Sequence, residues 1–158
     1  MRTLLIKIIF LASLVAGATA CSSDTWEDVP GPIADFLTDY FPLQPVDNCG
    51  YSDDVWHIKL HTSAALTFDE RYKWISVNGY GNTLPPMFLF DELPPALYAY
   101  LQELSLTGGV YSVTRDNFNY HVMLLDSSVT YTISTGVVTP DVPASSAIAQ
   151  LGMKKGEI

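Results

Sequence analysis

The sequence predicts an α+β fold made of two tandem repeats. Each repeat is a helix followed by an antiparallel meander, and together they form one antiparallel sheet with two helices packed on one face. The first observation behind this prediction is internal repetition: residues 29–33 align with 93–97, and residues 56–60 with 120–124, at a shift of 64 positions. The second is that the spacing of apolar residues changes within each half from helical to alternating. A period of this length indicates a repeated supersecondary unit, with chance agreement between apolar patterns as the alternative.

Each repeat opens with a predicted helix. In the first repeat, apolar side chains recur at helical spacing from Ile33 to Phe41, and Pro42 ends the helix. In the second, the same stripe runs from Leu97 to Leu104. The pair Gly108-Gly109 then predicts a chain reversal before the strands of the second repeat.

Strands follow each predicted helix. Residues 56–61 and 120–125 alternate apolar and polar side chains, the pattern of a strand that is half buried in a sheet. Residues 65–69 and 73–77 are predicted to form a hairpin, and residues 128–134 are its expected counterpart in the second repeat. In that alignment Leu66-Thr67-Phe68 matches Tyr131-Thr132-Ile133 after a slip of one residue.

The predicted domain spans residues 29–138, with repeat one at 29–78, a link at 79–92 and repeat two at 93–138. The link contains the apolar run Met87–Phe90. We expect this run to pack against the edge of the sheet, and an exposed binding patch is the alternative. Residues 139–158 form a C-terminal tail, either a short helix on the sheet or a disordered end.

The N-terminal segment has the layout of a bacterial secretory signal. A basic start at Arg2 and Lys7 precedes an apolar stretch and small residues up to Ala20, so residues 1–20 are the predicted signal peptide. Because this layout resembles the lipobox of bacterial lipoproteins, we expect Cys21 to be lipidated. Cleavage after Ala20 without lipidation is one alternative. A membrane anchor is another, although the apolar run is shorter than the ~20 residues that a spanning helix needs.

Residues 21–28 are predicted to be a lipid-anchored acidic tether. The run resembles the export signals of Bacteroidetes surface lipoproteins, and a solvated tether with no export role is the alternative. The expected location is therefore the cell envelope, with the protein lipid-anchored to the outer membrane on its periplasmic or outer surface.

The composition restricts the partners. The chain has 8 Lys and Arg against 17 Asp and Glu, a net charge of −9, and loss of residues 1–20 would remove two of the basic residues. Nucleic acid is excluded as a partner because binding it requires many basic side chains. Anionic membrane surfaces are disfavoured for the same reason, so membrane attachment would depend on the lipid.

The chain has two cysteines, and the fate of one depends on the other. If Cys21 is acylated, Cys49 has no disulfide partner in the chain. If Cys21 is free, a Cys21–Cys49 bridge is possible in an oxidising compartment. We expect Cys49 to be a buried, small apolar side chain.

The histidines are the first candidates for catalysis or metal binding. His57 and His61 share a strand face but lie ~13 Å apart at ~3.3 Å per residue, too far to hold one zinc ion. His57 and His121 occupy equivalent repeat positions and are expected on the sheet surface. The sequence has no Gly-x-Ser-x-Gly, His-Glu-x-x-His or phosphate-binding loop. We therefore predict no catalytic residue and no metal ligand.

Acidic pairs are the other candidates for a metal site. They are Asp53-Asp54, Asp69-Glu70 and Asp91-Glu92, together with the stretch Asp116–Asn119. Their oxygen atoms suit calcium, but none has the spacing of an EF-hand loop. We expect solvated turns at these positions, with a calcium site as the alternative.

Three segments carry a resemblance to a known family: Pro30–Ile33, Trp56–Leu60 and Leu66–Val77. On these segments the chain resembles the PepSY-like family of secreted bacterial proteins, described as β-lactamase-inhibitor-like, over about residues 28–136. The resemblance implies a curved sheet whose free face holds a partner, and some members are described as calcium-regulated periplasmic proteins. Repeat two departs from the family pattern because Tyr131–Ser134 lacks the Phe-Asp and Trp of the hairpin.

These observations predict a non-enzymatic envelope protein that binds a protein or peptide partner through its sheet face or its apolar link. The aromatic content of 12% favours an interface. The candidate partner-binding residues are His57, His121, Met87, Phe88 and Phe90. The alternatives are a calcium-responsive periplasmic module, with calcium as its only cofactor, and a hydrolase with a dispersed site.

Overall fold

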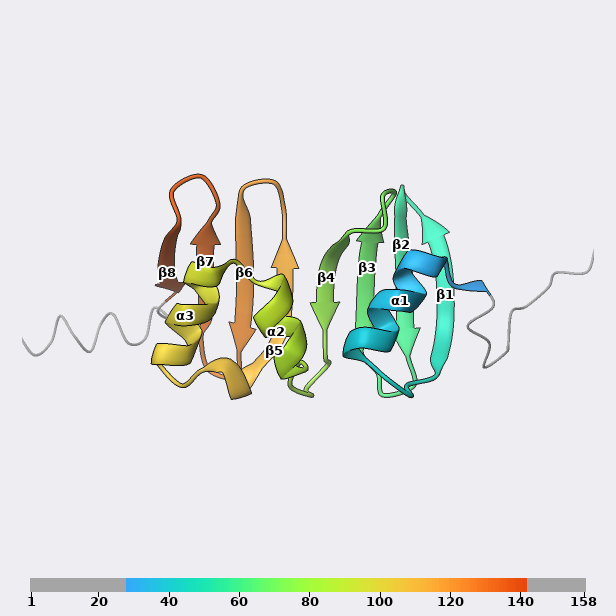
Figure 1. Ribbon diagram of the computed structural model, residues 1–158, viewed down its shortest axis with the longest axis horizontal. Helices are drawn as coiled ribbons and strands as arrows, with labels where there is room; N and C mark the ends of the chain where they lie inside the picture. The colour runs from blue at the N-terminus through green and yellow to red at the C-terminus, as the bar shows by residue number, and fades with distance from the viewer. Residues whose placement is uncertain (1–27, 142–158) are drawn as a thin grey trace, which may run out of the picture.

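The computed structural model describes residues 28–141, in which three α-helices are combined with eight strands (Figure 1). The predicted signal peptide, Cys21, nearly all of the tether and most of the tail lie outside the described residues. The elements in chain order are α1 (Gly31–Tyr40), β1 (Val46–Ser52), β2 (Val55–Leu60), β3 (Ala65–Asp69), β4 (Trp74–Asn78), α2 (Pro86–Glu92), α3 (Pro95–Glu103), the 3-10 turn η2 (Thr107–Gly109), β5 (Val110–Arg115), β6 (Asn119–Leu124), β7 (Ser128–Thr132) and β8 (Val137–Asp141).

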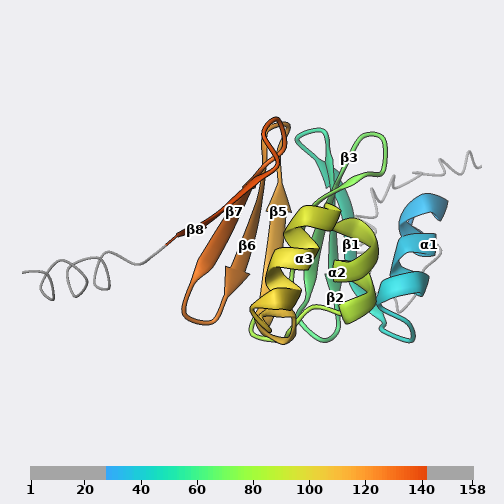
Figure 2. The same cartoon turned by 60° about the vertical axis from the view of Figure 1, so that its left-hand side comes forward.

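The eight strands form one sheet, and their order in the sheet is their order in the chain. Every neighbouring pair is antiparallel. The three helices lie on one face of the sheet and leave the other face without a helix (Figures 1 and 2). The predicted α+β class and the single antiparallel sheet are confirmed, and α2 is a third helix that the sequence analysis did not identify.

The repeat is visible in the structure. The pairs Gly31 and Pro95, Val46 and Val110, and Val55 and Asn119 each begin equivalent elements 64 positions apart. The first ladder of each repeat also has an irregularity at the same place, after Val46 in one repeat and after Val110 in the other. Two segments of the same chain therefore adopt the same helix-and-meander topology.

The alignment of the third strands differs from the prediction. Ile58 pairs with Leu66 in repeat one, and the equivalent Val122 pairs with Val129 in repeat two. The counterparts of Leu66-Thr67-Phe68 are thus Val129-Thr130-Tyr131, and the predicted match to residues 131–133 is wrong. The reason is the connecting turn, which spans residues 61–64 in repeat one and only 125–127 in repeat two.

Three strands were missed by the sequence analysis. β1 and β5 were not predicted. In β1, Asp47, Asn48 and Gly50 interrupt the alternation of apolar and polar side chains. Because β5 is the counterpart of β1 in the repeat, it was missed together with β1. β8 extends to Asp141, so the first residues of the predicted tail belong to the sheet. Pro140 lies in β8, which is an edge strand, where a missing backbone N–H is tolerated.

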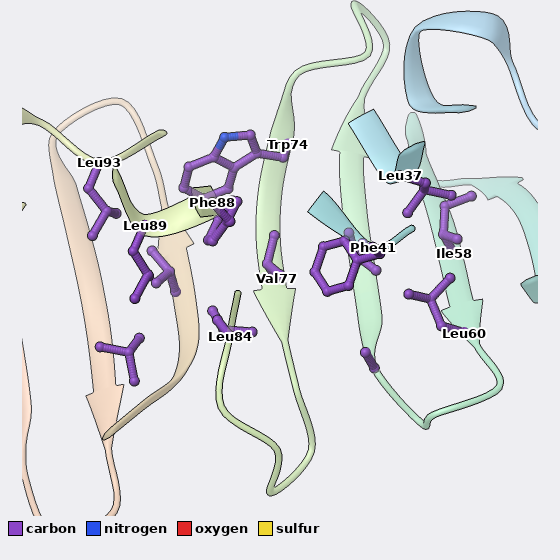
Figure 3. Close-up of a cluster of buried hydrophobic side chains, with 14 of the residues drawn as sticks. Leu37, Phe41, Ile58, Leu60, Trp74, Val77, Leu84, Phe88, Leu89 and Leu93 are labelled. Carbon is purple, nitrogen blue, oxygen red and sulfur yellow. The ribbon is translucent and has the colours of Figure 1, made fainter. Parts of the chain in front are cut away.

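The core lies between the sheet and the helices (Figure 3). The first and third helices bury equivalent pairs one turn apart, Ile33 and Leu37 in α1 and Leu97 and Leu101 in α3. Each helix begins immediately after a proline, at Pro30 and Pro94, where the missing N–H costs no intrahelical bond.

Helix α2 fills the core where the two repeats meet. The fully buried ring of Phe88 packs edge-on against Trp74 of β4, with ring centroids 5.3 Å apart, and against Phe36 of α1 at 5.9 Å. The expectation that residues 87–90 pack against the sheet edge is wrong, because β4 is the fourth of eight strands. This helix is difficult to recognise in the sequence, because it begins with proline and has only seven residues.

Glu92, the last residue of α2, joins three elements. Its carboxylate accepts a hydrogen bond of 2.6 Å from Trp74 Nε1 and one of 3.2 Å from the Tyr40 hydroxyl. Burial, together with the negative charges of Glu92 and Asp91, raises the pKa of Tyr40 well above its usual range. The phenol of Tyr40 is therefore held in its neutral form as a donor to Glu92.

Candidate functional site

The free face of the sheet, the one without helices, carries a continuous polar row. Cross-strand partners lie on the same face of a sheet, so the pairings connect one residue from each strand. The polar row consists of Gly50, His57, Thr67, Ser76, Thr114, His121, Thr130 and Thr139. Apart from the glycine, every member has a hydroxyl or imidazole group, so the row presents hydrogen-bonding groups along the whole width of the sheet.

Both histidines predicted as partner-binding residues belong to the polar row. His57 is exposed, and His121 is half-buried with Nδ1 3.1 Å from the hydroxyl oxygen of Thr130. They are four strands apart, which is ~19 Å at ~4.8 Å per strand. One metal ion could not contact both.

A pocket of about 450 Å³ lies beside His57 on this face. The third histidine is elsewhere: His61 follows β2 in a turn, where its Nδ1 is 3.0 Å from a carboxylate oxygen of Asp47. The residues that line the pocket are Asn48, His57, Ile58, Lys59, Ser63, Ala65, Leu66, Thr67 and Tyr80. The structure thus places His57, one of the predicted partner-binding residues, in the wall of a pocket.

The apolar residues of the link divide between core and surface. Met87 and Phe90 are 60% and 61% exposed on the outer side of α2, whereas Phe88 is fully buried. The prediction that Phe88 contacts a partner is therefore wrong, since its ring is a central part of the core. Phe90 packs edge-on against Tyr98 of α3 at 5.4 Å, so the exposed apolar surface of the link extends onto α3.

A groove separates the two repeats at one end of the sheet. The β4–β5 ladder has only three residue pairs, Ser76–Thr114, Val77–Val113 and Asn78–Ser112, fewer than any other ladder. Beyond the Ser76–Thr114 pair, Arg115 Nε donates a hydrogen bond of 2.5 Å to the carbonyl oxygen of Trp74. The guanidinium carbon lies 4.3 Å from the centre of the indole ring, a cation–π contact.

This opening, the inter-repeat groove, has a volume of about 610 Å³. It is lined by Asp69, Arg71, Lys73, Trp74, Ile75, Arg115, Asp116, Asn117, Tyr120 and Ile133. Sequence analysis did not identify it, because its walls come from different repeats. The sequence feature that could have indicated the groove is Arg115, a charged residue that aligns with Tyr51 of the first repeat.

The acidic pairs occupy turns and helix ends. Asp53 and Asp54 both have positive φ, 52° and 63°, and form the two-residue turn between β1 and β2. Asp69 Oδ1 accepts hydrogen bonds from the backbone N–H of Arg71 and Lys73, at 2.8 and 2.9 Å. Over residues 28–141, no three His, Cys, Asp or Glu side chains gather closely enough to hold a metal ion.

Asp116 has the same role in the turn between β5 and β6. Its Oδ1 accepts hydrogen bonds of 2.7 Å from the backbone N–H groups of Phe118 and Asn119. These bonds lower the pKa of the carboxyl group, because they favour its ionised form. The carboxylates beside the groove thus stabilise turns.

In the part of the chain that the structure describes, no helix is long and apolar enough to cross a membrane. No family model matches the chain, and no curated protein matches it.

Solved structures share the fold. A protein of the DUF2874 family from Bacteroides vulgatus, described as periplasmic, is 19% identical, with a TM-score of 0.59 over 72% of this chain and 90% of its own. A Bacteroides thetaiotaomicron protein described as calcium-regulated and periplasmic is 16% identical, with a TM-score of 0.61 over 73% and 91%. A second B. vulgatus protein, described as periplasmic and of unknown function, is 15% identical, with a TM-score of 0.60 over 76% and 97%. At these identities the likeness establishes the fold.

Proposed function

We propose that the chain is a non-enzymatic cell-envelope protein that binds a protein or peptide partner through the free face of its sheet. The observation that carries this proposal is the polar row, which crosses all eight strands on the face without helices. Unlike the helix-covered face, this surface is open to a partner, and the pocket beside His57 gives it a concave point of contact. Hydroxyl and imidazole groups suit the polar backbone and side chains of a protein surface.

An envelope location is part of the proposal. It is supported by the fold shared with Bacteroides proteins described as periplasmic, and by the resemblance of residues 1–21 to a lipoprotein signal. We propose that Cys21 is acylated and anchors the protein to the outer membrane. Mass spectrometry of the N-terminal peptide tests this: a lipid-modified Cys21 is expected, and an unmodified Cys21 at the mature N-terminus contradicts it.

The binding face is tested by variants on opposite sides of the molecule. The free-face variant combines His57→Glu with His121→Glu, and the helix-face variant combines Met87→Ser with Phe90→Ser. Each protein is immobilised and used to capture partners from an envelope extract of the source organism, after circular dichroism has shown that it is folded. We expect the free-face variant to lose a partner that both wild type and the helix-face variant retain.

The opposite result, with loss only in the helix-face variant, would move the binding site to α2 and α3. Failure of the wild type to capture any partner would contradict the proposed function.

A calcium-responsive module is the second candidate, and the fold shared with a protein described as calcium-regulated favours it. A ligand that binds only the folded state raises the melting temperature. Millimolar calcium would therefore raise the melting temperature relative to a chelator, and identical melting curves would contradict this second candidate.

A further inference from the structure

The inter-repeat groove gathers most of the positive charge of the described chain. Between residues 28 and 141 there are four basic residues: Lys59, Arg71, Lys73 and Arg115. Three of them line the groove, and only Lys59 lies elsewhere, beside the free-face pocket. In a chain with a net charge of −9, this grouping is the feature that calls for an explanation.

Within residues 28–141, Lys73 and Arg115 of the groove form no ion pair with a carboxylate. Among the described residues, the only ion pair in the groove joins Arg71 to Glu70 at 4.0 Å, and both side chains are mostly exposed. No carboxylate oxygen of this part of the chain lies within ion-pair distance of Arg115 or Lys73. The nearby Asp69 and Asp116 each use an oxygen to bind backbone N–H groups of their own turns.

Arg115 is held in place but retains donors. A guanidinium has five N–H donors, and in the described residues one of these, on Nε, is hydrogen-bonded, to the carbonyl oxygen of Trp74. The guanidinium carbon also lies over the indole ring of Trp74, and this cation–π contact is the second interaction that holds the side chain. An arginine arranged in this way can form the paired, parallel hydrogen bonds that a carboxylate accepts.

We propose that the inter-repeat groove binds the carboxylate groups of an acidic ligand. Arg115 is the central contact, Arg71 and Lys73 attract the ligand from the rim, and the apolar side chains of Ile75 and Ile133 contact its carbon chain. The carboxylates come either from an acidic peptide or from a small dicarboxylic acid. This proposal does not depend on the free face of the sheet, because the two sites have no lining residue in common.

The test is isothermal titration calorimetry on the full chain at low salt. The probes are a blocked tetraglutamate peptide, glutarate, inorganic phosphate and, as a neutral control, blocked tetraglutamine. The variants are Arg115→Gln, Lys73→Gln and Lys59→Gln, which remove the same charge at the centre of the groove, at its rim and outside it.

We expect tetraglutamate or glutarate to bind wild type and tetraglutamine not to bind. Arg115→Gln should weaken binding about tenfold or more, the loss of a charge-assisted hydrogen bond. Lys73→Gln should weaken it about two- to fivefold, as for an exposed charge, and Lys59→Gln should leave it unchanged. Binding of glutarate assigns the groove to small acids, and binding of tetraglutamate alone assigns it to acidic peptides.

Three results would overturn the proposal. One is the absence of binding by both carboxylate probes. Another is an equal loss in Lys59→Gln and Lys73→Gln, which would show a general effect of net charge. The third is a preference for phosphate over both carboxylates. Because Lys73 is exposed, its variant keeps the test decisive even if Arg115→Gln disturbs the fold.

Discussion

The two repeats have one topology but different packing in their second hairpins. In repeat one, the pair Phe68 and Trp74 is almost fully buried across β3 and β4. The equivalent pair in repeat two, Tyr131 and Val138, is only partly buried across β7 and β8. The difference follows from position: β4 is central and covered by Phe88 of α2, whereas β8 is an edge strand. The comparison teaches that a strand's place in the sheet, more than its position in the repeat, decides how deeply equivalent side chains are buried.

The repeats also differ at the ends of their first strands. In repeat one, the ring of Tyr51 packs against Trp56 in a tilted arrangement, with centroids 5.0 Å apart. Its counterpart Arg115 instead bonds to Trp74 across the junction of the repeats. The inter-repeat groove therefore lies at a position where equivalent residues of the two repeats differ in type and in contacts.

Removing Phe88 has the largest expected effect, because its fully buried ring packs against both α1 and β4. Phe88→Ala should lower the free energy of unfolding by about 3–5 kcal/mol, the usual cost of truncating a buried aromatic ring. Urea denaturation measures the loss. Phe90→Ala is the matched control on the same helix, with an expected change within about 1 kcal/mol because Phe90 is mostly exposed. Equal losses in the two variants would show that α2 does not cover β4 as described.

A direct comparison of the repeats comes from Phe68→Ala and Tyr131→Ala, which truncate equivalent rings. Phe68 is fully buried, so its loss should exceed that of the half-buried Tyr131 by about 2 kcal/mol. The free energies of unfolding in urea give the difference. A Tyr131→Ala variant as destabilised as Phe68→Ala would mean that β7 and β8 are as well packed as β3 and β4.

Glu92→Gln tests the contacts that join α2 to β4 and α1. The substitution removes the negative charge of the carboxylate that accepts hydrogen bonds from Trp74 Nε1 and the Tyr40 hydroxyl. It should lower the free energy of unfolding by about 1–1.5 kcal/mol. Thermal unfolding at pH 7 measures the loss. Asp91→Asn, next to it, removes one long contact of 3.5 Å with the Tyr40 hydroxyl and should have little effect. A larger loss of stability in Asp91→Asn than in Glu92→Gln would show that Asp91, and not Glu92, joins these elements.

The smallest expected effect is at alkaline pH. The pKa of Tyr40 is higher in the folded chain than in the unfolded chain, where it is about 10. Its contribution to stability is therefore complete below pH 10 and is lost as the pH rises above 10 toward the folded value. Unfolding free energies between pH 8 and 11 should decline more steeply for wild type than for Tyr40→Phe. Parallel declines would contradict the raised pKa.

Much of the fold followed from local patterns. The helical stripes from Ile33 and Leu97 and the alternation around Ile58 and Val122 place these side chains in the core, and the structure buries all four. Helix α2 was missed because seven residues behind two prolines are too few to show a helical period. Without α2, the sequence does not mark Phe88 as a core residue, which is why it is among the predicted contact residues.

The candidate sites depended more on the tertiary structure. His57 and His121 were placed on the sheet surface from alternation, and the structure confirms this. The rest of the polar row was not predicted, because the register between neighbouring strands determines which residue of each strand lies in the row. The shorter turn before β7 shows how one residue changes that register.

By itself the sequence determined the repeat, the order of most helices and strands, and which side of the predicted strands faces the core. These properties depend on periods of two to four residues and on one period of 64, all of which can be read along the chain. Only the tertiary structure decided that α2 covers the junction, that the polar row is continuous and that Arg115 meets Trp74. Contacts of this kind join residues far apart in the chain, and they depend on strand register and on the packing of three helices against a single sheet.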